Sequence, residues 1–215
     1  LKSRYGLEQF PEDGVKYQVR FSIFKDNVVI GLDGSGEGLY KRGYRAVGVD
    51  APLRETLAAA VVILSRFRGK YPFCDPVCGS GTIPIEAALI AKNRAPGISR
   101  RFSAMDWTTL DPSVWSLAIE EARPREFSGD YRIVGSDIDP AALRIAREDA
   151  VRAGVDDVVR FEKADASEFA RKTENGIIVT NPPYGERIME KQEAEALYRS
   201  FGKAWSATEN WKLYL

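Results

Sequence analysis

Asn181, Pro182, Pro183 and Tyr184 form a tetrapeptide that suits recognition of an aromatic amine. The apolar run at 176–180 predicts a buried strand, and the prolines end it because they cannot donate to a ladder. The Asn181 side-chain oxygen and the Pro182 carbonyl can accept both N–H bonds of an exocyclic amino group, while the Tyr184 ring stacks on the base that bears it. For the tetrapeptide alone, a rigid turn is an equally good interpretation.

A second motif begins at Asp75 and continues through a glycine-rich turn to Thr82. Apolar residues recur at helical spacing over 83–91, so the sequence predicts a strand, a glycine turn and a helix. Pro84 stands where a dinucleotide fingerprint has its third glycine. Asp75 would repel a pyrophosphate, but it suits the ammonium of a methionine-like group. The motif therefore favours S-adenosylmethionine over NAD as the cofactor.

Two further carboxylates follow predicted strands. Asp137 ends a strand through Val134, and we assign it to a ribose diol because Asp139 is expected to cap the helix that begins at Pro140. A role in the turn alone is the alternative. Asp165 follows a strand at 158–163 and could accept an adenine amino group, with the backbone N–H of Ala166 reaching a ring nitrogen. The predicted cofactor contacts, at the carboxyl edge of a parallel sheet, are Asp75, Pro76, Cys78, Gly79, Gly81, Asp137, Ile138, Asp165, Ala166 and Asn181.

Taken together, these motifs resemble those of a known enzyme family. The chain resembles class I S-adenosylmethionine-dependent methyltransferases. It is similar in particular to bacterial 23S rRNA guanine-N2 methyltransferases with a THUMP RNA-binding domain, which are often labelled N6-adenine-specific DNA methylases. The resemblance rests on residues 41–45, 51–60, 75–88 and 181–187. The tetrapeptide is typical of amino methylation in general, whereas residues 185–187 and the runs at 41–45 and 51–56 point to the RNA branch.

The resemblance implies transfer of a methyl group from S-adenosylmethionine to the exocyclic amino group of a base in RNA, with guanine N2 of 23S rRNA as the expected acceptor. It implies that Asn181 to Tyr184 form the catalytic motif and that Arg42, Arg45 and Arg187 contact RNA. Adenine N6 of DNA is the alternative acceptor. An NAD-dependent oxidoreductase and a non-catalytic RNA-binding module are the alternatives from other classes.

The composition is that of an ordinary globular protein: 44% of the 215 residues are hydrophobic and 29% are charged. The formal net charge is zero, which disfavours tight RNA binding by a uniformly basic surface. Cys74 and Cys78, in a chain without histidine, are expected to be buried thiols of a reducing compartment. No run is long and apolar enough for a bilayer. We therefore expect a cytoplasmic protein with an RNA partner, no membrane and no metal.

The predicted elements fall into three segments. Residues 1–45 are β-rich and resemble the last strands of a THUMP domain, with strands at 15–24 and 28–32, a turn at Asp26-Asn27 and a loop at 31–38. Residues 46–70 form a linker whose helix runs from Pro52 to Leu64. Residues 71–215 form a Rossmann-like α/β methyltransferase domain with an open parallel sheet.

Two features of that domain complete the prediction. The sheet is expected to be truncated at its C-terminal end, with a fifth strand at 211–215 and the last two strands of the complete fold missing. Because the chain also lacks an initial Met, we expect a fragment. The stretch 93–128 is predicted to be a loop and an extra helix, which either packs on the domain or covers the site.

Overall fold

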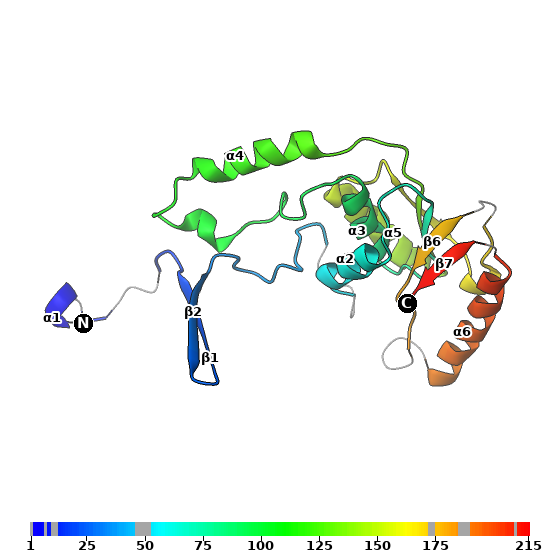
Figure 1. Ribbon diagram of the computed structural model, residues 1–215, viewed down its shortest axis with the longest axis horizontal. Coiled ribbons are helices and arrows are strands. Elements are labelled where there is room, and N and C mark those ends of the chain that lie inside the picture. The colour runs from blue at the N-terminus through cyan, green and yellow to red at the C-terminus, as the bar shows by residue number, and fades with distance from the viewer. Residues whose placement is uncertain are drawn as a thin grey trace. The chain divides into compact units, whose positions relative to one another are not determined.

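The computed structural model describes the whole chain except residues 1, 7, 10–12, 46–52, 172–174, 185–189 and 209. Internal contacts divide the chain into two units, and Figure 1 draws both of them. One unit comprises residues 1–38 and 101–118, and the other comprises residues 39–100 and 119–215. The segment 101–118, which the sequence placed in the methyltransferase domain, therefore groups with the N-terminal residues.

A β-hairpin dominates the first unit, which begins with the short helix α1 (Lys2–Tyr5). Strands β1 (Gln18–Phe24) and β2 (Asn27–Asp33) pair antiparallel in a register that joins Phe24 to Asn27. Lys25 and Asp26 both have positive φ, 47° and 60°, which is the backbone of a type I′ turn. The predicted Asp26-Asn27 turn was therefore wrong by one residue, and the loop expected from residue 31 begins only after Asp33.

The segment 101–118 packs against the base of this hairpin. The Trp107 ring stacks on Tyr17 with centroids 5.2 Å apart, and Trp107 Nε1 donates to the Lys16 carbonyl at 3.1 Å. A 3-10 helix, η1 (Ser103–Asp106), lies in this segment, and the Ala104 N–H donates to the Gly34 carbonyl. Helix α4 (Ser113–Ala122) follows; it is described along its whole length and buries none of its residues. Its Trp115 ring stacks on Phe102 with centroids 5.6 Å apart, and whether the helix packs on the domain or covers the site stays a prediction.

The second unit is built on a sheet with strand order β5-β4-β3-β6-β7, in which every neighbouring pair of the described strands is parallel. The strands are β3 (Phe73–Asp75), β4 (Ile133–Asp137), β5 (Val159–Lys163), β6 (Gly176–Val179) and β7 (Trp211–Tyr214). The chain runs outward from β3 to β5 and then returns to β6 on the opposite side of β3. This order confirms the predicted Rossmann-like α/β class.

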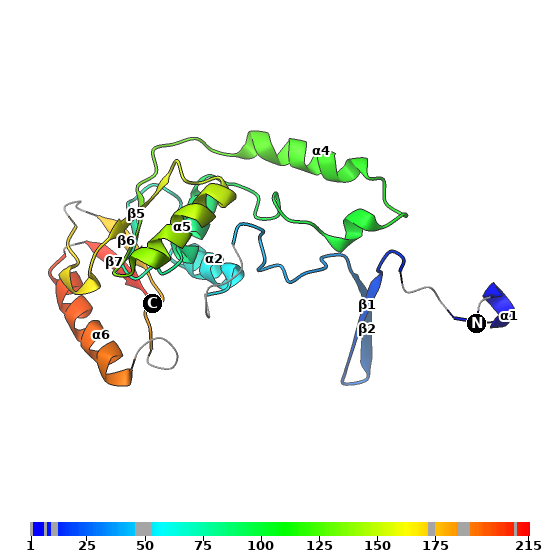
Figure 2. The same ribbon diagram turned by 180° about the vertical axis from the view of Figure 1, so that it is seen from behind.

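Helices cover both faces of the sheet. Helices α2 (Glu55–Leu64), α3 (Thr82–Ala91) and α5 (Pro140–Ala153) lie on one face and α6 (Lys191–Ser206) on the other, as Figures 1 and 2 show from opposite sides. On β6, Ile177 and Val179 belong to one apolar cluster and Ile178 to the other. Because both faces are buried, β6 is apolar at consecutive positions instead of alternating with polar residues. No helix in the described part of the chain combines the length and apolarity that a membrane crossing requires.

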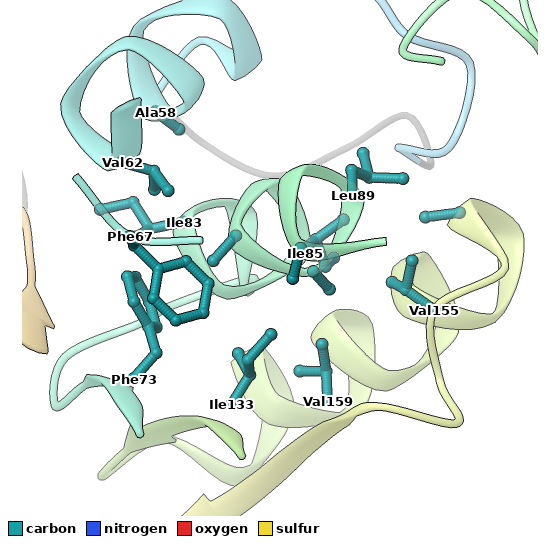
Figure 3. Close-up of a cluster of buried hydrophobic side chains, with 14 of the residues drawn as sticks. Ala58, Val62, Phe67, Phe73, Ile83, Ile85, Leu89, Ile133, Val155 and Val159 are labelled. Carbon is teal, nitrogen blue, oxygen red and sulfur yellow. The ribbon is translucent and has the colours of Figure 1, made fainter. Parts of the chain in front are cut away.

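Helix α3 lies at the centre of the larger cluster. In Figure 3, Ile83, Ile85 and Leu89 of α3 lie between α2, with Ala58 and Val62, and the strand side chains Phe73, Ile133 and Val159. Every residue of α3 except Ile90 is buried. The neighbouring rings of Phe67 and Phe73 have centroids 4.8 Å apart. The glycine turn therefore leads directly into a helix that is held by close packing along almost its whole length.

The ends of α5 follow the sequence signals. The Asp139 side chain accepts a hydrogen bond from the Ala141 N–H at 2.8 Å, Pro140 is the first helical residue, and Gly154 ends the helix at a φ of 66°. Leu143, Ala146, Ala150 and Ala153 form the buried stripe of this helix. Two 3-10 helices, η2 (Arg123–Arg125) and η3 (Ala166–Glu168), precede β4 and follow β5.

Candidate active site

Two predicted motifs meet where the strand order reverses. In open parallel sheets ligands bind at the carboxyl edge beside this switch point, which here lies between β3 and β6. Asp75 ends β3, and Thr180 follows β6 directly. The Thr180 hydroxyl donates to Asp75 Oδ1 at 2.7 Å, and both side chains are buried. This bond thus joins the glycine turn to the tetrapeptide at 181–184, although the two motifs lie about a hundred residues apart in sequence.

The two glycines of the turn have different surroundings. Both have left-handed backbones, with φ values of 52° at Gly79 and 79° at Gly81. A Cβ at Gly79 would meet nothing within 4 Å, whereas a Cβ at Gly81 would lie 2.8 Å from Ala146 and from the Phe161 ring. Gly79 therefore faces open space where a ligand can approach, and Gly81 allows the turn to pack against α5 and β5.

This difference predicts opposite phenotypes for two alanine substitutions. Gly81→Ala adds a left-handed strain and an overpacked methyl group, so it should lower the free energy of unfolding by about 2–4 kcal/mol. Gly79→Ala should cost only about 1 kcal/mol in unfolding, but its methyl group should weaken binding of S-adenosylhomocysteine by roughly tenfold or more. Urea unfolding and calorimetry measure the two effects. Equal stability losses with unchanged affinity would contradict the assignment.

Asp137 ties the tip of β4 to the glycine turn. Its Oδ2 accepts the Gly79 N–H at 2.8 Å, and its Oδ1 accepts the Asp139 N–H at 2.9 Å. The Cys78 N–H donates to the Ser136 carbonyl of the same strand at 2.9 Å. Asp137 therefore has a turn role, as the alternative interpretation held. The predicted contact with a ribose diol is compatible with it because the side chain remains partly exposed.

Asp75 has an electrostatic property that suits a cationic ligand. The pKa of its carboxyl group is raised to about 7, mainly by burial and to a smaller extent by the charge of Asp137. The hydrogen bonds donated by Thr180 and by the Val77 N–H act in the opposite direction and lower this pKa. Both of these hydrogen bonds reach Oδ1, and Oδ2 has none among the described residues. A positively charged group at Oδ2 would stabilise the ionised carboxylate. Pro76, next in the chain, is buried.

The exit of β5 contributes the remaining predicted cofactor contacts. Asp165 caps η3 by accepting the Ser167 N–H at 2.8 Å. Hydrogen bonding from the Ser167 side chain, and then from its backbone N–H, lowers the pKa of this exposed carboxyl group. Ala166 is buried behind it. At the exit of β4, the Ile138 side chain is 64% exposed, so its apolar surface is free to cover a flat ring. Contacts of these residues with an adenine remain predictions.

The tetrapeptide presents its polar and aromatic groups to the outside. Asn181 is exposed, Tyr184 is 64% exposed, and Pro182 and Pro183 are half-buried. The Tyr198 hydroxyl of α6 donates to the Pro183 carbonyl at 2.8 Å. This bond occupies the Pro183 carbonyl, whereas the sequence analysis assigns the neighbouring Pro182 carbonyl to the amine. The sequence analysis did not identify this contact of Tyr198.

The two cysteines are free, buried thiols, as expected. Burial raises the pKa of Cys74 to about 11 and that of Cys78 well above its usual value, so both remain protonated and neither is a nucleophile at neutral pH. Arg171 donates to the Cys74 sulfur at 3.0 Å. In the part of the chain that the structure describes, no group of three side chains could hold a metal ion.

Arg42 and Arg45, two of the predicted RNA contacts, have partners within the protein, and their contact with RNA stays a prediction. Arg42 Nε lies 2.9 Å from Glu86 Oε1, which also accepts the Tyr44 hydroxyl at 3.0 Å. Arg45 donates to the Thr82 hydroxyl and to the Leu53 carbonyl. Only 11% and 17% of the two arginine side chains are exposed, and their charges face Glu86 of α3 and Glu55 of α2. Arg187, the third predicted RNA contact, lies outside the described residues.

A parallel sheet of this order, with a glycine turn after its central strand and Asn-Pro-Pro-Tyr beside it, defines the class I methyltransferase fold. The family model of the RMKL-like methyltransferase domain matches residues 42–215, and the chain belongs to this family.

Three relatives support the assignment. "Putative RNA methyltransferase YpsC" of Bacillus subtilis is 42% identical over the whole chain, which spans 56% of that protein. "Ribosomal RNA large subunit methyltransferase K/L" of Vibrio parahaemolyticus is 41% identical over 86% of the chain and 27% of its own length. The crystal structure described as "SMU.472, a putative methyltransferase complexed with SAH" has a TM-score of 0.85 at 35% identity and covers 94% of this chain and 53% of that one. The chain thus spans about half or less of each relative.

Proposed function

We propose that the chain binds S-adenosylmethionine and transfers its methyl group to the exocyclic amino group of a base in RNA, with guanine N2 of 23S rRNA as the substrate. The observation that carries this proposal is the bond between Thr180 and Asp75, because it brings an amine-accepting loop to the start of a cofactor turn. Such an rRNA substrate would place the activity in the cytoplasm.

The cofactor assignment rests on the chemistry of the turn. Asp75 offers a buried carboxylate to an ammonium group, Gly79 leaves room for close approach, and Asp137 stands at the tip of the next strand, where ribose hydroxyls are held in this fold. The bound S-adenosylhomocysteine named for one relative supports the same assignment. When bound, the cofactor supplies a methyl group on a positively charged sulfur.

The residues after β6 would orient the acceptor. An aromatic amine is a poor nucleophile because its lone pair is delocalised into the ring. Acceptance of its two N–H bonds by the Asn181 oxygen and the Pro182 carbonyl would favour a tetrahedral nitrogen and direct the lone pair at the methyl group. Tyr184, exposed beside them, would stack on a base that has left its helix. The chain has no histidine, so we propose that the proton leaves to solvent after transfer.

The N-terminal unit is proposed to belong to a THUMP-like RNA-binding domain that begins upstream of the linker helix. Its hairpin exposes large apolar side chains on both strands, among them Phe21, Ile23 and Ile30. An isolated two-stranded hairpin is marginal in water, so these side chains suit a larger sheet. Because Arg42 and Arg45 are paired with Glu86 and Glu55, RNA affinity would depend on this domain more than on those two residues.

The decisive experiment is a methyl-transfer assay with the full-length protein. We expect incorporation into the exocyclic amine of guanine in 23S rRNA, little into duplex DNA and none without nucleic acid. Mass spectrometry of digested product identifies the modified base. Adenine methylation of duplex DNA at equal or better efficiency would instead establish the DNA alternative, which shares the same tetrapeptide. Binding of NAD in place of S-adenosylhomocysteine would reject both.

A further inference from the structure

Thr180 is the only polar residue in the run 176–180, and it lies completely inside the protein. Its side chain is 2% exposed and Asp75 is 1% exposed. The Thr180 hydroxyl donates to Asp75 Oδ1, and its backbone N–H donates to the Tyr214 carbonyl of β7 at 3.1 Å. Thr180 therefore connects the carboxyl ends of β3, β6 and β7 immediately before Asn181.

The loop that follows has limited freedom. It starts at a residue anchored to β3 and β7, and the Tyr198 hydroxyl of α6 holds it again at the Pro183 carbonyl, 2.8 Å away. The two anchors enclose Asn181 and Pro182, which carry the proposed amine acceptors. The first of these bonds, 2.7 Å long, is charge-assisted when the Asp75 carboxyl group is ionised.

We propose that Thr180 is a positioning residue for methyl transfer, because its hydroxyl connects the carboxylate that holds the cofactor ammonium to the loop that holds the acceptor amine. This inference rests on the proposed function. Binding of the cation at Asp75 Oδ2 keeps the carboxylate ionised, and an ionised Oδ1 accepts the Thr180 bond most strongly. Occupancy of the cofactor site thereby favours the productive position of Asn181.

The same bond predicts a pH signature for cofactor binding. Asp75 has a pKa raised to about 7 by burial, and the Thr180 hydrogen bond stabilises its ionised form. The other ionisable groups around Asp75 are Asp137, which raises the pKa of Asp75, and Cys74 and Cys78, whose own pKa values are raised by burial. The sign follows directly: ammonium binding requires the carboxylate, so affinity falls as the pH drops through this pKa. Removal of the hydroxyl raises the pKa and moves the loss to higher pH.

Thr180→Val in the full-length protein tests the inference, because valine keeps the shape and removes the donor. We expect the midpoint of S-adenosylhomocysteine binding against pH to rise by about one unit, and kcat for 23S rRNA to fall about tenfold or more at saturating cofactor and pH 9. At pH 9 the Asp75 carboxylate is ionised in both proteins, so a lower kcat reports the position of the loop. Calorimetry across pH and single-turnover kinetics measure the two quantities.

Two further variants separate positioning from stability. Thr180→Ser keeps a hydroxyl and should restore the pH midpoint and most of the turnover. Thr208→Val makes the same chemical change after α6, where the hydroxyl donates to the Ala204 carbonyl at 3.2 Å, and it should leave both readouts unchanged. If Thr180→Val does not fold, Thr180→Ser becomes the test. The inference is then overturned if Thr180→Ser binds S-adenosylhomocysteine or methylates RNA differently from the unmodified protein. An unshifted midpoint with unchanged kcat in Thr180→Val overturns it as well. An unmodified protein that binds S-adenosylhomocysteine with this pH midpoint but methylates no RNA instead rejects the proposed function.

Discussion

Asn181→Ala is expected to lower kcat about 100- to 1000-fold while changing cofactor affinity little. The Asn181 oxygen is one of two proposed acceptors for the amine protons, and its bond strengthens as the nitrogen becomes tetrahedral. An interaction that strengthens toward the transition state affects turnover more than ground-state binding. Single-turnover methylation of 23S rRNA, with calorimetry for S-adenosylhomocysteine, measures the two quantities separately.

The matched control for this variant lies at the other end of β6. Asn175 is exposed just before β6, at the amino end of the sheet and away from the site, so Asn175→Ala should have normal turnover. A loss of cofactor affinity in Asn181→Ala as large as the loss of turnover would make Asn181 a cofactor ligand or a structural residue. Methyl transfer by the chain would then need a different amine acceptor.

Asp137→Ala is expected to weaken binding of S-adenosylhomocysteine by about 2–3 kcal/mol, or roughly 30- to 150-fold. The carboxylate holds the Gly79 N–H at 2.8 Å and thereby shapes the turn, and it is also the proposed acceptor for the ribose hydroxyls. Its removal leaves a backbone donor unpaired and removes the charged acceptor. Calorimetry with the full-length protein gives the affinity, and kcat at saturating cofactor should change much less.

Asp130→Ala provides the comparison, because Asp130 is an exposed aspartate that precedes β4 at the opposite end of the strand. It should bind the cofactor normally. Normal affinity in Asp137→Ala would confine Asp137 to its turn role, which was the alternative drawn from sequence. Tighter binding of NAD than of S-adenosylhomocysteine by the unmodified protein would overturn the cofactor assignment.

Local signals in the sequence were sufficient for most of the fold. The order of strands and helices, the cap at Asp139, the stop at Gly154 and the buried stripe of α5 all depend on residues within a few positions of one another. Backbone stereochemistry and hydrophobic periodicity act over the same short range. The parallel sheet follows from alternating strands and helices, so the carboxyl-edge location of the motifs could be predicted as well.

The tertiary structure alone decided how the polar side chains pair. Sequence analysis counted Arg42 and Arg45 as candidates for phosphate contact, but the fold brings Glu86 and Thr82 to them from α3. The same holds for Trp107, which packs on the hairpin, and for Tyr198, which reaches Pro183. In each pair the partners are distant in sequence, and no periodic pattern links them.

The contrast has a physical cause. Apolar burial is non-directional, so a pattern of residue types is sufficient to specify which side of an element faces the core. A hydrogen bond requires a particular donor to lie about 2.9 Å from a particular acceptor, and that depends on the register of strands that pair only in the folded chain. Sequence by itself therefore determined the class of fold and the edge on which Asp75 and Asn181 lie. Only the folded structure decided that Thr180 joins them.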